Sequence, residues 1–172
     1  MAEISWPRRS YEAGVLLIPL DADARAWAAA RTDGALDGIT VAGAQLLSAQ
    51  RRFEPEPVPT TGEGTAVSSP LEQAMHDADV VVLFTHDLAV VDRHSVTEIS
   101  DAARLAGKLL GAMVISPGAR WEQPAAHQTV TTIRESVDNV IILKDDRFVL
   151  AVLQVLRGGT HEVTLGGTAV RT

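Results

Sequence analysis

Four side chains capable of metal binding or proton transfer follow an apolar strand in the middle of the chain. The strand covers residues 79–84, and His86, Asp87, Asp92 and His94 come soon after it. Two imidazoles and two carboxylates can hold a divalent metal or carry out general acid–base catalysis. Because open α/β sheets gather their catalytic groups at the carboxyl ends of strands, this turn is a candidate metal-dependent or acid–base site.

The same residues also have a simpler interpretation. Asp92 is well placed to cap the helix that follows, and His86 and His94 then become partly exposed turn residues. Asp21 and Asp23 follow the first apolar strand and would supply further ligands if the two loops meet. The sequence leaves both interpretations open.

Strands and helices alternate along the chain, which predicts an α/β fold. Asp23 is a candidate N-cap for the first helix, and Pro70 suits the first position of a later one. The expected architecture is a three-layer, Rossmann-like open sheet, mainly parallel, with helices on both faces. The predicted strands are 14–20, 39–42, 79–84, 109–115 and 137–143. The predicted helices are 21–31 or 23–31, 44–52, 70–76, 93–107, 125–136 and 147–156.

We expect three segments: an N-terminal arm over 1–13, a nucleotide-binding-type domain over 14–157, and a C-terminal tail or added edge strand over 158–172. Residues 53–70 are rich in proline, glycine, serine and threonine, which predicts a long loop and a candidate binding loop.

The composition narrows the class of partners. The chain has 172 residues, of which 46% are hydrophobic, and a net charge of -7. The negative charge argues against nucleic acid and anionic membranes as partners. No cysteine is present, which excludes disulfides and thiolate sites and suits a reducing compartment. We therefore expect a cytoplasmic protein without a membrane segment.

Several stretches resemble the GTPase domain of the bacterial division protein FtsZ, the relative of tubulin. The strongest is the strand at 137–143 followed by Asp145, Asp146, Arg147 and Phe148, where that family has an Asn-Asp-Arg-Leu turn. The strand at 79–84 and the helix and strand after it add to the resemblance, which covers most of residues 14–156.

The chain departs from that family where its members bind GTP. Glycine-rich loops let backbone N–H groups approach a phosphate, but this chain has no glycine in either corresponding loop. The resemblance therefore implies a degenerate nucleotide cleft. Its candidate residues are Leu20, Asp21, Asp23, Thr85, His86, Asp87, Asp145 and Arg147.

The resemblance implies a non-catalytic FtsZ-like protein that acts through self-association or a protein partner, in cell division or cytoskeletal regulation. No GTPase activity and no cofactor are expected, although GTP, GDP and a divalent metal stay open as ligands. The alternative is a small metal-dependent or acid–base enzyme that uses His86, Asp87, Asp92 and His94.

Overall fold

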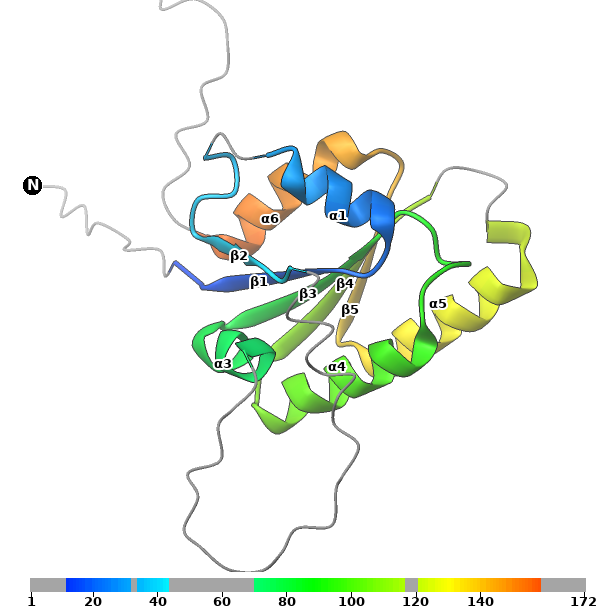
Figure 1. Ribbon diagram of the computed structural model, residues 1–172, viewed down its shortest axis with the longest axis horizontal. Helices are drawn as coiled ribbons and strands as arrows, with labels where there is room; N and C mark the ends of the chain where they lie inside the picture. The colour runs from blue at the N-terminus through cyan, green and yellow to red at the C-terminus, as the bar shows by residue number, and fades with distance from the viewer. Residues whose placement is uncertain (1–11, 32–33, 44–69, 117–120, 159–172) are drawn as a thin grey trace, which may run out of the picture.

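The computed structural model describes residues 12–31, 34–43, 70–116 and 121–158. Its elements alternate between strand and helix, as the sequence predicts (Figure 1). They are β1 Val15–Pro19, α1 Ala22–Ala29, β2 Ile39–Val41, α3 Pro70–Asp77, β3 Val80–Thr85, α4 Arg93–Leu105, β4 Leu109–Ile115, α5 Pro124–Ser136, β5 Asn139–Leu143, the 3-10 turn η2 Asp146–Phe148 and α6 Val149–Arg157.

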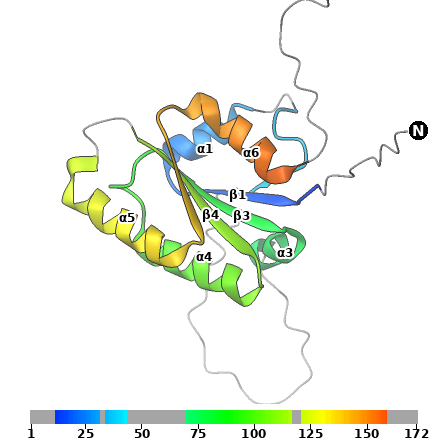
Figure 2. The ribbon, with the colours of Figure 1, turned by 180° about the vertical axis from the view of Figure 1, so that it is seen from behind.

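The five strands form one sheet in the order β2-β1-β3-β4-β5, and all neighbouring pairs are parallel. Helices α1 and α6 cover one face, and α3, α4 and α5 cover the other (Figures 1 and 2). The expected three-layer α/β fold with helices on both faces is therefore confirmed.

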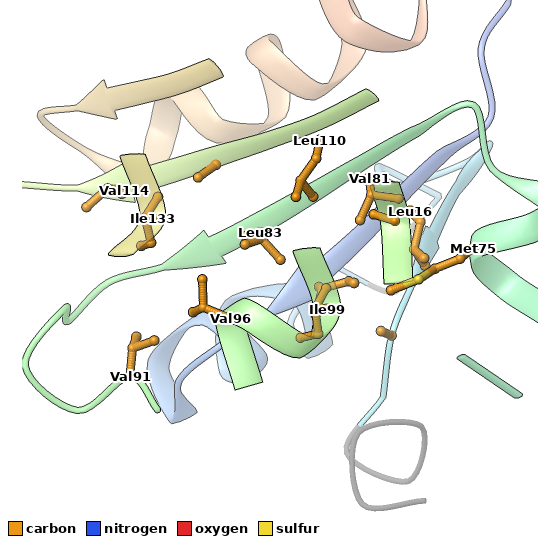
Figure 3. Packing of buried hydrophobic residues seen from close by; sticks show 14 of the residues in the cluster. Leu16, Met75, Val81, Leu83, Val91, Val96, Ile99, Leu110, Val114 and Ile133 are labelled. Carbon is orange, nitrogen blue, oxygen red and sulfur yellow. The ribbon is translucent and has the colours of Figure 1, made fainter. Parts of the chain in front are cut away.

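Alternation along the buried strands builds two cores. Leu16, Val81 and Leu83 point toward α3, α4 and α5, where Figure 3 shows them packed with Met75 and Ile99 among others. Residues one position away, such as Val82 and Phe84, point toward α1 and α6. Both faces of β1 and β3 are buried, which explains why these strands are unbroken apolar runs in the sequence.

The strand order places a topological switch at β1 and β3. Chain connections leave β1 toward β2 on one side and toward β3 on the other, so a crevice opens outside the carboxyl ends of this pair. The order 2-1-3-4-5 is the flavodoxin-like one. Pro19 lies beside Phe84 in the register, and the Leu20 amide donates to the Phe84 carbonyl at 2.8 Å, so the loops after the two strands start side by side.

The N-cap predicted for the first helix is wrong. The N-cap of α1 is Asp21, whose carboxylate accepts from the Ala24 amide, whereas Asp23 lies exposed in the first turn. Pro70 does begin α3, and Asp92 does cap α4.

Several predictions lie outside the described residues: most of the arm 1–13, the helix 44–52, the loop 53–70 before Pro70, and the tail 158–172 beyond its first residue. Where the two ends are described, Glu12 and Gly158 form an isolated antiparallel bridge, and Arg157 pairs with Glu12. Within the described residues, no helix combines the length and the apolar character needed to cross a membrane.

Candidate active site at the carboxyl edge of the sheet

The Asp21 carboxylate joins the loops that follow β1 and β3. Its Oδ1 accepts from the Ala24 amide at 2.7 Å, and its Oδ2 accepts from the Thr85 hydroxyl and the His86 amide, both at 2.6 Å. The Asp87 amide donates to the same Oδ2 at 3.2 Å. Asp21 is only 4% exposed, so this network is a buried one.

The hydrogen bonds keep this buried carboxylate ionised. Burial alone would raise the pKa of Asp21, because it penalises the charged form. The bonds donated by the Thr85 hydroxyl and by three backbone amides outweigh burial and lower the pKa of Asp21 below its ordinary value. The β3–α4 loop is thus held around a fixed negative charge.

His86 is the least exposed of the histidines that the structure describes, with a side chain 16% exposed. Its ring lies edge-on to Phe84, with centroids 4.9 Å apart. Its Nε2 lies 3.8 Å from Oδ2 of Asp146, beyond the reach of a direct hydrogen bond. Its Nδ1 is buried and has no hydrogen-bond partner within the described part of the chain.

The other three members of the predicted metal cluster are engaged locally. Asp87 Oδ1 accepts from the Ala89 amide at 3.0 Å. Asp92 accepts from the Ser95 hydroxyl at 2.7 Å and from the His94 amide at 3.1 Å, so it acts as the cap of α4. These bonds, with that from Ser95 the largest, lower the pKa of Asp92.

His94 points away from the others. Its Nε2 lies 3.2 Å from Oε1 of Glu98, one helical turn along α4, and the side chain is 79% exposed. Throughout the described residues, no group of three or more His, Cys, Asp or Glu side chains is arranged to hold a metal ion. The four residues of the alternative metal site, His86, Asp87, Asp92 and His94, are therefore not gathered around one point in the described structure, and Asp87 and Asp92 accept from amides of their own loop.

The remaining residues of the predicted cleft lie in two places. Leu20 packs against the core under α3 and α4, and Asp23 is exposed on α1. Asp145 accepts from the Arg147 amide at 2.8 Å and pairs with the Arg147 side chain at 2.9 Å. This pairing lowers the pKa of Asp145 and satisfies the turn within itself.

Sequence reasoning did not assign Asp146 or Phe84 to the site. Asp146 reaches His86 because β4 lies between β3 and β5, so the loops after β3 and β5 flank the end of one strand. Phe84 belongs to an apolar strand, and it also forms one wall beside His86. Finding the contact with Asp146 would have needed the strand order, whereas Phe84 and His86 lie two residues apart, so alternation along the strand places them on one face.

The comparisons with known proteins give few matches. No family model and no curated protein is similar enough to the chain to match. Among solved structures, the chain is similar to one titled an FMN-dependent cysteine decarboxylase, SpaF. The TM-score is 0.42 and the identity 16%, and the alignment covers 84% of this chain and 86% of that one.

The resemblance to FtsZ is contradicted: no family model matches the chain, and the solved structure is titled an FMN-dependent decarboxylase rather than a GTPase of the tubulin class. The predicted degenerate GTP site and the role in cell division are wrong with it. Local contacts explain the residues on which the resemblance mainly rested, because Asp145 caps η2 and pairs with Arg147. Such a turn needs no nucleotide to account for its residue types.

The switch point does not fit a phosphate-bearing cofactor either. Flavodoxin-like folds bind FMN at the β1/β3 switch. Here the amides of Ala24, His86 and Asp87 already donate to the Asp21 carboxylate. A flavin phosphate would have to displace a buried anion that is part of the chain. The described residues at the switch point therefore do not fit a flavin phosphate.

Proposed function

We propose that the chain is a small acid–base enzyme in which His86 exchanges a proton with a phosphate-free ligand at the carboxyl edge of the sheet. The observation that carries the proposal is the environment of His86. It is the one largely buried histidine in the described residues, and it lies between Phe84 and Asp146 at the edge where α/β folds place their ligands.

The two ring nitrogens have different roles in this proposal. Nδ1 is buried, so Nε2 is the nitrogen that can exchange a proton with a ligand. Asp146 lies 3.8 Å from Nε2 and does not lock it in a hydrogen bond, so a polar ligand atom can interact with both groups. Asp146 pairs with the ring when the ring is protonated. Nδ1 is a buried polar atom without a hydrogen-bond partner in the described residues, and a catalytic role is one of the reasons for such an atom.

The charges at this edge favour a neutral or cationic ligand. Asp23, Asp145 and Asp146 border it, and the buried Asp21 carboxylate adds a further negative charge. Arg147 is occupied by Asp145. Small amines and amides therefore suit the site better than carboxylates or phosphates.

Histidine side-chain NMR tests the proposal with a panel of small primary amines and amides. We expect members that bind to shift the His86 ring signals while those of His94 and His127, which are exposed, stay in place. Compounds that bind are then assayed for turnover with wild type, His86→Gln and the matched control His94→Gln. Glutamine keeps a polar group near the Nε2 position but cannot exchange the proton.

Loss of general acid–base catalysis lowers the rate by about 10²–10⁴-fold, and we expect a loss in this range for His86→Gln alone. Turnover that survives His86→Gln, or ligand shifts confined to His94, would contradict the proposal.

A further inference from the structure

An apolar surface remains uncovered along β5 and α6 in the described residues. It contains a pocket of about 460 Å³ with an entirely apolar lining. Two of its members are strongly exposed, Phe148 at 52% and Val155 at 71%. We call it the β5–α6 face. Its residues are Ile141, Leu143, Phe148, Ala151, Val152, Val155 and Leu156.

The same surface contains an open sheet edge. β5 pairs with β4 on one side and with no other strand of the described chain. The Leu143 carbonyl accepts from the Ser116 amide, so the backbone groups of Leu143 point toward β4. By alternation, the N–H and C=O groups of Val140 and Ile142 point outward. An exposed edge of this kind can pair with another strand.

The charges along β5 are arranged for pairing with an identical strand. Asp138 lies three residues before Ile141, and Lys144 lies three residues after it. Oδ2 of Asp138 accepts from the Leu110 amide of β4, and an ionised carboxylate can accept more than this one bond. If two copies pair antiparallel with a two-fold axis at Ile141, Lys144 of each copy lies opposite Asp138 of the other. Opposite charges directly across two strands stabilise the pair, and both pairs form at once because a two-fold interface is isologous.

We propose that the β5–α6 face is a homodimer interface in which two β5 strands pair antiparallel about Ile141 and extend the sheet across both copies. In this register Val140 of one copy and Ile142 of the other form the hydrogen-bonded pairs, as their outward backbone groups require. The α6 helices then bring Phe148 and Val155 of both copies over the joined edge. The proposal is independent of any role for His86.

The absence of native cysteine allows a direct test of the register. At the two-fold axis, Ile141 of one copy lies opposite Ile141 of the other as a non-hydrogen-bonded pair. The two Cα atoms are then about 4.5 Å apart, a distance that a disulfide between cysteines at this position can span. We expect Ile141→Cys to form a disulfide-linked dimer under mild oxidation. The matched control is Leu143→Cys on the same face, whose two copies would lie about 13 Å apart along the strand and cannot bridge.

Sedimentation equilibrium of the untagged full chain tests the association itself. We expect wild type to reach twice its 18.3 kDa mass at concentrations of about 100 µM. Val155→Lys places a charge in the interface and Lys144→Glu faces Asp138 of the other copy. We expect the first to raise the dissociation constant at least about tenfold and the second to raise it less. Both positions are exposed, so circular dichroism should show that each variant folds as wild type does.

A monomeric wild type would overturn the proposal, and would leave the face to a terminal segment of the chain or to a different protein. Equal cross-linking of the Ile141→Cys and Leu143→Cys variants would also overturn it, and so would a dissociation constant that Val155→Lys leaves unchanged. In either case the interface would lie elsewhere.

Discussion

Replacing Asp21 should destabilise the fold more than replacing any other carboxylate described at this edge. In Asp21→Asn the remaining oxygen can still accept from the Ala24 amide, but the new NH₂ group cannot accept from the Thr85 hydroxyl or from the amides of His86 and Asp87. Buried donors left without an acceptor cost about 1–3 kcal/mol each in isolation. Partial relaxation of the loop reduces their sum, so we expect a loss of about 2–4 kcal/mol.

Asp21→Ala also removes the cap of α1, which adds about 1 kcal/mol. A total of about 3–5 kcal/mol is a large part of the roughly 5–15 kcal/mol that stabilises a typical domain. Urea unfolding at neutral pH, followed by circular dichroism, measures both variants. Asp23→Asn is the matched control: it is exposed in the same helical turn, and we expect it to stay within about 0.5 kcal/mol of wild type.

The difference in the free energy of unfolding between wild type and Asp21→Asn should change with pH in one direction. Because the folded-state pKa of Asp21 lies below its ordinary value, its stabilising effect is complete above that ordinary value. The effect is lost as the pH falls through the lowered folded-state pKa. The gap between wild type and Asp21→Asn should therefore be constant from neutral pH down to about pH 5 and shrink at lower pH. A gap below about 1 kcal/mol at neutral pH, or one that widens in acid, would refute this account of the network.

Two further substitutions test local features of the fold. Asp92→Ala removes the cap of α4 and should lower the free energy of unfolding by about 1 kcal/mol at neutral pH, as measured by urea unfolding. Because the pKa of Asp92 is lowered in the folded state, this loss should become smaller at acidic pH. A loss that does not change with pH would contradict the capping role. Gly38→Ala should cost about 2–3 kcal/mol in thermal unfolding, because Gly38 has a φ of +74° and an added Cβ would lie 2.6 Å from Nε of Arg157. In an Arg157→Ala background the clash is absent and only the backbone strain remains, so an unchanged cost there would show that the contact with Arg157 does not matter.

The sheet could be predicted from the sequence because its signals are local. The apolar run before Thr85 and the strand 109–115 stand out by composition and length, and the structure forms both. Proline at position 70 and aspartate at position 92 mark helix starts through their own backbone preferences.

The site could be predicted only in part, because contacts across the sheet edge depend on strand order. The sequence placed Asp21 and His86 on loops after strands, yet the bond from the His86 amide to Asp21 requires β1 and β3 to be neighbours. The contact between His86 and Asp146 likewise requires β4 to lie between their strands. Spacing within one loop suggested a metal cluster, whereas Asp92 and His94 interact with their own helix.

A carboxylate that belongs to the polypeptide cannot be diluted away or competed off by solutes, unlike a diffusible anion. The loop after β3 is therefore preorganised before a ligand binds. A ligand at His86 would lose no binding free energy to ordering the backbone around it. Exchange of one guest for another should then leave this part of the main chain in place, with side chains making whatever adjustment is needed.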